Sequence, residues 1–227
     1  MATIYASTND GYVLRSNQAS WSDARNNSSG TGYSSTVSST SVGTSAYRQA
    51  ARGGGYVYSI FRSFFSFTTS GISSNVDVST LQIYGRLFNT GDVIAVKATS
   101  GISSLGTADF EAIAGWDSSG TDGSGGGDME SSVTKYSDEV TTWSSTGYNS
   151  ISLNAQAKAD MRDDNTVYIA LINFDYDLKD VEPTGYSDNR NGMYYATYTG
   201  TSRDPKLVYT LEPATTEDNA VFFGTNF

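Results

Sequence analysis

Three pairs of carboxylates stand close together in the sequence and could carry acid–base chemistry: Asp109 with Glu111, Asp138 with Glu139, and Asp175 with Asp177. A glycosidase needs two carboxyl groups about 5 to 10 Å apart across a sugar. Neighbouring carboxylates more often lie on solvated turns. The chain also has no histidine and no cysteine, which removes the common general base and the usual zinc ligands. We therefore expect a protein that is not an enzyme.

Asp122 and Asp128 lie in a glycine-rich stretch, DGSGGGDME, which loosely resembles a glycine-rich calcium repeat. Such repeats bind calcium between stacked copies, and this chain has one degenerate copy. Asp160, Asp163, Asp164 and Asn165 supply further oxygen ligands of the kind calcium prefers, but a helix end followed by a turn is the favoured explanation for them. We expect no metal and no cofactor, with Asp122 and Asp128 as the weak calcium candidates.

Tyrosine is abundant, with 16 copies in 227 residues. Its ring has a flat apolar face and a polar edge, which suits contact with sugars as well as burial in a core. Four tyrosines within or after an Asp- and Asn-rich loop are the best candidates for glycan contact: Tyr186, Tyr194, Tyr195 and Tyr198. Burial in the core is the alternative for each of them.

The segment Tyr56 to Phe67, YVYSIFRSFFSF, has the most informative pattern for the fold. In an extended strand, Phe65 and Phe67 share one face, whereas Ile60 and Phe64 share the other. A strand that is apolar on both faces is normally buried between two layers. This pattern predicts the centre of a β-sheet.

Two other segments are expected to pair with this strand: residues 76–88, next along the chain, and residues 166–174, which are also apolar on both faces. Short helices are expected over residues 107–114 and 154–162. Glycine, serine, threonine and asparagine dominate the remaining segments, as is typical of turns and solvent-facing strands. The sequence therefore predicts an all-β, jelly-roll-like antiparallel β-sandwich with one or two short helices, formed by residues 1–211 as a single domain.

The formal net charge is −10 at pH 7, which bounds the partners of the chain. An acidic surface repels phosphate backbones and anionic lipid, so we expect neither a nucleic acid nor a membrane as partner. No basic region or long apolar run follows Met1, so we expect no secretory signal peptide there.

Residues 212–227 follow the last expected domain strand and differ from it in composition. They begin with an acidic run and a proline and contain four late apolar residues: Val221, Phe222, Phe223 and Phe227. One interpretation is a final strand that completes the fold. The other is a docking segment whose apolar residues become buried on a partner. Both interpretations stay open at this point.

Two segments are similar to jelly-roll modules called DNRLRE-type domains. These are FRSFFSFTTSGI followed by VDVSTLQIYG, over residues 61–85, and the closing GTSRDPKLVYTL, over residues 200–211. The order of these segments resembles a group of tailed-phage virion proteins more closely still. Three further motifs carry that resemblance: NDGYV at residues 9–13, LGTADFEAIAGW at residues 105–116, and PTG at residues 183–185.

The resemblance covers about residues 3–211, and it contains no catalytic residue. It implies a bacteriophage virion structural protein, such as a head decoration, a head fibre or a tail-associated protein, located in a virion that assembles in the host cytoplasm. Its implied partners are other virion proteins of the capsid or tail, further copies of this chain in a homo-oligomer, and surface glycans of the host. The alternative is a carbohydrate-binding module of a surface adhesin or of a polysaccharide-active enzyme.

Overall fold

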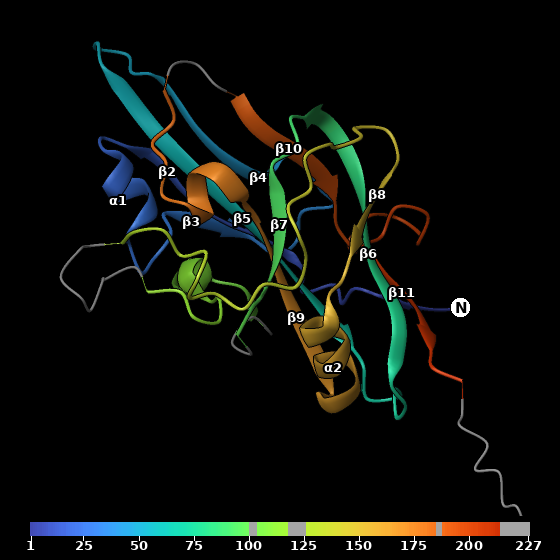
Figure 1. The fold of residues 1–227 in the computed structure, drawn as a ribbon. Coiled ribbons are helices and arrows are strands. Elements are labelled where there is room, and N and C mark those ends of the chain that lie inside the picture. The colour runs from blue at the N-terminus through green and yellow to red at the C-terminus, as the bar shows by residue number, and fades with distance from the viewer. Residues whose placement is uncertain (100–103, 118–125, 185–187, 214–227) are drawn as a thin grey trace, which may run out of the picture.

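The computed structural model describes residues 1–99, 104–117, 126–184 and 188–213 of the chain (Figure 1). These residues form an antiparallel β-sandwich with a few short helices, so the predicted fold class is confirmed. The expectations for Asp122, for Tyr186 and for the apolar residues of the C-terminal segment lie outside the described residues. No helix of the described part is both long and apolar enough to cross a membrane.

Strand β5 (Tyr56–Thr68) is the centre of one layer, the inner sheet. It pairs along one edge with β2 (Gly11–Gln18), which in turn pairs with β3 (Gly32–Ser34). Along the other edge it pairs first with β4 (Ser39–Ala50) and then with β9 (Thr166–Asn173), and β7 (Val93–Lys97) pairs with β9. The predicted pairing with residues 166–174 is therefore confirmed.

Strand β6 (Val76–Asn89) is the centre of the second layer, the outer sheet. It pairs with β8 (Tyr148–Ser152), β10 (Asp188–Tyr194) and β11 (Lys206–Leu211), and β1 (Ala2–Tyr5) pairs with β11. Because β10 also pairs with β4, the two layers form one continuous sheet that folds over on itself. The predicted pairing of β5 with residues 76–88 is wrong, since these strands lie in opposite layers and meet only through their side chains.

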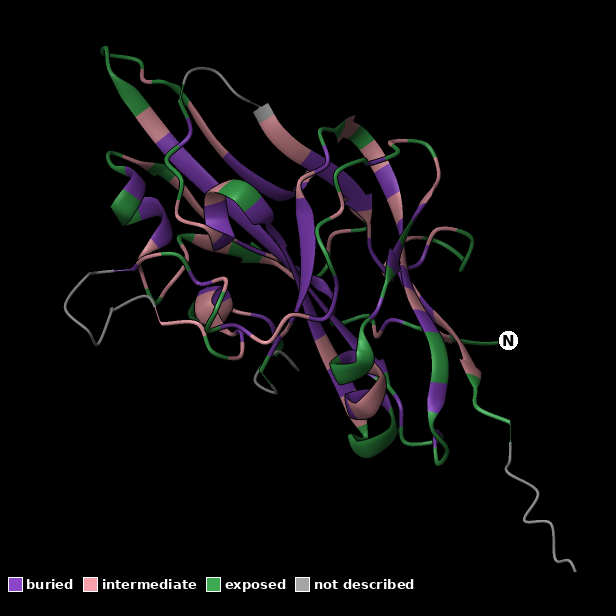
Figure 2. Cartoon of the chain, in the orientation of Figure 1, coloured by how far each residue is buried: buried purple, intermediate pink, exposed green. Residues whose placement is uncertain are grey.

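The space between the layers is a hydrophobic core. Phe65 and Phe67 of β5 and Ile83 of β6 are buried there, and Figure 2 shows the buried stretches of the two layers in purple. Helix α2 (Ala155–Asp163) closes one end of this core, and its N-terminus is capped by the side chain of Asn154, which accepts a hydrogen bond from the Ala157 amide at 3.1 Å. The predicted second helix is thus present.

The opposite face of β5 is covered as well. Ile60 and Phe64 are buried there in a second apolar cluster. The cover consists of α1 (Trp21–Arg25), the 3-10 helix η2 (Thr107–Glu111), the π-helix η3 (Phe174–Leu178) and the loops around them. This third layer of short helices explains why β5 is apolar on both faces, since neither face meets solvent.

Candidate functional site

Two of the three carboxylate pairs contain side chains that form hydrogen bonds or ion pairs within the fold. The Asp109 carboxylate accepts a hydrogen bond from the Gly106 amide at 2.7 Å and so caps η2. Asp175 forms an ion pair with Lys179 at 3.5 Å, and Asp177 is fully buried. These pairs do not present two available carboxylates to a common opening, as glycoside hydrolysis would require.

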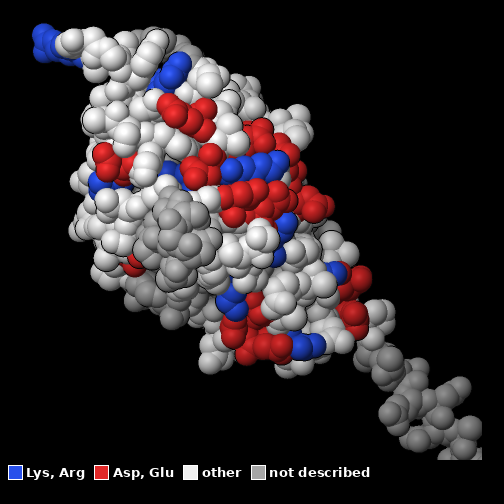
Figure 3. Space-filling view, turned by 60° about the vertical axis from the view of Figure 1, so that its left-hand side comes forward, with Lys and Arg blue, Asp and Glu red and all other residues white. Residues whose placement is uncertain are grey.

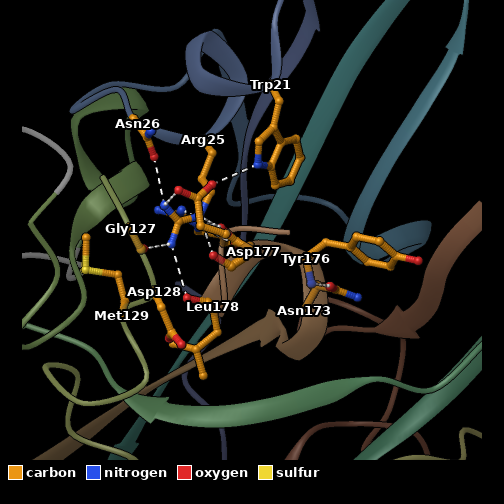
Figure 4. Close-up of polar contacts among 12 residues, drawn as sticks. Trp21, Arg25, Asn26, Gly127, Asp128, Met129, Asn173, Tyr176, Asp177 and Leu178 are labelled. Atoms are coloured by element: carbon orange, nitrogen blue, oxygen red, sulfur yellow. Dashed lines mark hydrogen bonds and ion pairs between the residues drawn. The ribbon is translucent and has the colours of Figure 1, made fainter. Parts of the chain in front are cut away.

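Asp177 belongs to a buried cluster with Arg25 and Arg62, which we call the arginine brace. The Arg62 guanidinium donates to both carboxylate oxygens of Asp177, at 2.8 and 2.7 Å. Arg25 lies 3.9 Å from the same carboxylate and 3.4 Å from that of Asp180. Figure 4 shows Arg25 reaching from α1 toward η3, where its Nη2 donates to the carbonyl oxygens of Gly127 at 2.7 Å and Leu178 at 3.1 Å.

Aromatic rings cover the arginine brace. The Arg62 guanidinium carbon lies 4.1 Å from the ring centre of Phe110 and 3.9 Å from that of Trp116. Burial lowers the pKa of Arg25, while Asp177 and Asp180 oppose that shift. The arginine brace joins β5, α1 and η3. Both arginines and Asp177 have no exposed side-chain surface, so the brace cannot contact a substrate.

The acidic residues at the end of α2 are neutralised by cations. Lys97 Nζ lies 2.9 Å from the Asp160 carboxylate and 3.6 Å from that of Asp164, and Arg162 pairs with Asp163 at 2.6 Å. Acidic and basic groups also lie side by side on the face shown in Figure 3.

The calcium candidates have no metal-binding arrangement in the part of the chain that is described. Asp128 is exposed, and its Oδ1 accepts a hydrogen bond from the Glu130 amide at 2.7 Å, while Asp122 lies outside the described residues. Nowhere among the described residues do three or more acidic side chains gather closely enough to hold a metal ion.

The outward side of the outer sheet carries a cluster of tyrosines, which we call the tyrosine face. It consists of four partly buried residues from three strands and one loop: Tyr84, Tyr148, Tyr194 and Tyr198. Neighbouring ring centres lie 4.9 to 5.6 Å apart, and the ring planes meet at 79° to 85°. Such edge-to-face pairs stabilise one another, but mutually perpendicular rings do not form one flat platform for stacking a sugar.

Two cations lie on these rings. The guanidinium carbon of Arg203 is 4.7 Å from the ring centre of Tyr194 and 5.2 Å from those of Tyr84 and Tyr198, and Nη1 donates to the Tyr194 hydroxyl at 2.7 Å. Lys206 Nζ lies 4.0 Å above the ring of Tyr148. The tyrosine face therefore combines rings with positive charge.

The structure separates the tyrosines that the sequence grouped together. Tyr194 and Tyr198 belong to the tyrosine face, whereas Tyr195 is fully buried. Successive side chains of an extended segment point to opposite sides, so the Tyr195 ring enters the core, where it stacks on Phe65 at 5.8 Å and its hydroxyl lies 2.7 Å from that of Ser63. Tyr195 is therefore not available for glycan contact, and the alternative of burial in the core holds for it. Burial raises its pKa well above the ordinary value.

Sequence reasoning missed Tyr84, Tyr148, Arg203 and Lys206 as members of the face. A signal existed in the alternation of Gln82, Tyr84 and Arg86 with apolar residues along one strand, which predicts an outward row. This alternation could not predict that Arg203, from a distant loop, lies on the same row of side chains.

The tyrosine face thus combines four rings with two cations at the surface, whereas the arginine brace is sealed inside. Comparison of the sequence with models of known protein families and with curated proteins finds no match to either.

Proposed function

We propose that this chain is a non-enzymatic structural protein of a tailed-phage particle, attached to the capsid or tail and able to contact surface glycans. One observation carries the proposal. Motifs that resemble virion proteins lie where segments far apart in the sequence contact one another. The likeness therefore concerns residues that build the sandwich. Motifs that build the sandwich suit a structural role, and they contain no catalytic residue.

Two of these motifs are particularly informative. In NDGYV, the Asp10 carboxylate accepts a hydrogen bond from the Ala196 amide at 2.9 Å and so fixes the approach to β2 against the segment after β10. In LGTADFEAIAGW, the rings of Phe110 and Trp116 enclose Arg62 of the arginine brace. Each motif therefore joins segments that are far apart in the sequence, which suits a role in building the sandwich.

Attachment to the particle is assigned to the C-terminal segment. The last described strand ends at Leu211, which is 44% exposed, and residues 214–227 follow it with the apolar side chains of Val221, Phe222, Phe223 and Phe227. Apolar residues beyond the last strand suit a segment that becomes buried on a neighbouring virion protein or on a second copy of this chain.

The test is co-sedimentation of tagged protein with particles that lack it. Deletion of residues 219–227 should abolish co-sedimentation while leaving the near-UV circular dichroism and the thermal midpoint of the domain unchanged. A matched control replaces the same nine residues by a Gly-Ser segment of equal length. Undiminished binding of the truncated protein would refute docking through this segment, and absence of the full-length protein from purified particles would refute the virion role.

A carbohydrate-binding module is the second candidate, and the tyrosine face favours it. Tyr194 and Tyr198 were singled out from the sequence for glycan contact, and both lie on that face with Tyr84 and Tyr148. This candidate predicts binding to immobilised glycans by the isolated protein. A glycan array without binding partners would count against it and would leave the virion role standing.

A further inference from the structure

We propose that the tyrosine face is a binding site for an acidic polysaccharide, with Arg203 and Lys206 holding the carboxylate or sulfate groups of the sugar chain. This inference rests on the glycan-contact part of the proposed function and names the class of ligand. It begins from what the rings of the face are doing.

The rings serve chiefly as supports for cations. Arg203 is held over three of them and is tethered to the Tyr194 hydroxyl, and Lys206 is held over Tyr148. A guanidinium that is already positioned loses little conformational freedom when it binds, and its planar fork matches a carboxylate or sulfate with two parallel hydrogen bonds. Each of the four rings thus has a cation over it, and the cluster presents positive charge.

The charge of these two cations has no internal partner. Neither Arg203 nor Lys206 forms an ion pair with a carboxylate of the described residues, whereas Arg25, Arg62, Lys97, Lys135, Arg162 and Lys179 all do. The chain as a whole carries a net charge of −10. In such a protein, two cations gathered at one partly buried surface cluster form a local positive site that complements an anionic ligand.

The surroundings of the tyrosine face suit a sugar chain. Next to the rings, the outer sheet presents amide and hydroxyl groups, and the Gln82 amide lies 3.4 Å from the Ser150 hydroxyl. A hollow of about 390 Å³ adjoins the cluster, with Tyr148, Thr142 and Ser150 among its lining residues. Its size falls within the range of small-ligand sites, about 300–1,000 Å³.

The experiment measures binding of the full chain to a polyuronate oligosaccharide by isothermal titration calorimetry. The same oligosaccharide with its carboxyl groups reduced to alcohols is the neutral probe. We expect the neutral probe to bind at least tenfold more weakly and the affinity for the polyuronate to fall with added salt. A sulfated galactan of similar length shows whether sulfate replaces carboxylate.

The variants separate this site from charge in general. Lys206→Gln and the double variant Arg203→Gln/Lys206→Gln should weaken polyuronate binding by tenfold or more. Arg203→Lys keeps the charge but loses the planar fork and should weaken binding severalfold. Arg52→Gln, which removes the same charge from an exposed residue outside the face, should leave binding unchanged, and thermal midpoints confirm that each variant is folded.

The outcomes are distinct from those of the particle test. Equal binding of the neutral and acidic probes would overturn the inference while leaving glycan contact intact. Unchanged polyuronate binding by the double variant would overturn it as well. A third outcome is that the parent protein binds no oligosaccharide and the double variant loses particle attachment. The tyrosine face would then bind a virion protein, which would refute the acidic glycan as ligand and support the virion role.

Discussion

Arg62 and Asp177 are joined by two parallel hydrogen bonds, of 2.8 Å from Nε to Oδ2 and 2.7 Å from Nη2 to Oδ1, although 115 residues separate them in the chain. The pair fixes the π-helix η3 onto the middle of β5. Removing two charges from water is costly, and the bidentate geometry together with the rings of Phe110 and Trp116 offsets that cost. The pair therefore specifies how the third layer sits on the sheet.

Breaking this pair on one side should be strongly destabilising. Asp177→Asn leaves the Arg62 guanidinium buried without a counter-charge, so we expect the free energy of unfolding to fall by about 3–5 kcal/mol. Urea denaturation followed by tryptophan fluorescence measures this loss. Arg62→Met/Asp177→Leu removes both charges and should recover part of the stability, since Arg25 keeps its ion pair with Asp180 at 3.4 Å.

An exposed pair provides the control for this prediction. Lys135 and Glu130 lie 3.4 Å apart with about two-fifths of each side chain exposed, and Lys135→Gln should change the urea midpoint little because solvent screens such pairs. A loss for Asp177→Asn no larger than for Lys135→Gln would contradict the structural role of the brace.

The stability of the fold should decrease as the pH rises from about 4 to about 8. Burial raises the pKa of Asp10 from 3.8 to about 8, with a smaller contribution from Asp204 in the same direction. Between these pH values the unfolded chain has released its proton whereas the folded protein still holds it. The loss amounts to about 1.4 kcal/mol for each unit by which the two pKa values differ.

Asp10→Asn tests this pH dependence. Asparagine keeps an oxygen that can accept the Ala196 amide hydrogen bond but does not titrate. Burial also raises the pKa of Asp92, to about 6, so the variant should lose stability only up to about pH 6 instead of pH 8. Thermal midpoints measured from pH 4 to pH 9 would show the difference. A variant whose profile coincides with that of the parent protein would rule out Asp10 as the origin.

Gly85 lies where the outer sheet is approached by another backbone segment. A Cβ atom at this position would lie 1.7 Å from the Ser144 carbonyl oxygen and 2.9 Å from the Asn149 amide nitrogen. Gly85→Ala must therefore push β6 away from that segment, and we expect a loss of about 3 kcal/mol or more. Gly53→Ala, where a Cβ meets nothing within 4 Å, is the matched control. The urea midpoints of the two variants should differ clearly. Equal midpoints would show that β6 and the segment at Ser144 can move apart without loss of stability.

Tyr195 and the tyrosine face should respond differently to loss of a hydroxyl. Tyr195→Phe removes the buried contact with Ser63 and should lower stability by about 1 kcal/mol, leaving polyuronate binding unchanged. Tyr194→Phe removes the hydroxyl that tethers Arg203 and should weaken polyuronate binding with little change in the thermal midpoint. Calorimetric binding together with thermal denaturation of each variant distinguishes the two roles, and a binding defect in Tyr195→Phe would contradict the assignment.

The Phe-rich strand could be predicted from sequence because its apolar residues occupy both faces, and the same pattern identified its partner β9. Its relation to β6 could not be predicted, since both strands are apolar and proximity along the chain does not decide which layer a strand joins. Only short edge strands around residues 33–42 could be expected in the region of β4, because its serines, threonines and glycine give little apolar periodicity. Its place between β5 and β10 is stabilised by backbone hydrogen bonds, which carry no sequence signature.

The candidate site was predictable only in part. Tyr194 and Tyr198 could be picked out by their position after a polar loop, but Tyr195 shares that loop and points the other way. Arg203 stands in a loop that the sequence does not relate to Tyr84, and it is the fold of the sheet that brings them to 5.2 Å. The sequence can therefore identify candidate tyrosines for a glycan site, whereas the cations that lie over their rings can be identified only from the tertiary structure.

The pairing of β1 with β11 imposes an order on folding. Ala2 lies opposite Tyr209 and Tyr5 opposite Lys206, so the first of the described strands pairs with the last of them. At translation rates of about 5–20 residues per second, β1 waits roughly 10–40 s for its partner. The outer sheet, with Lys206 of its tyrosine face, is therefore completed only after synthesis of the described strands has ended, and contacts of such high sequence separation favour slow folding.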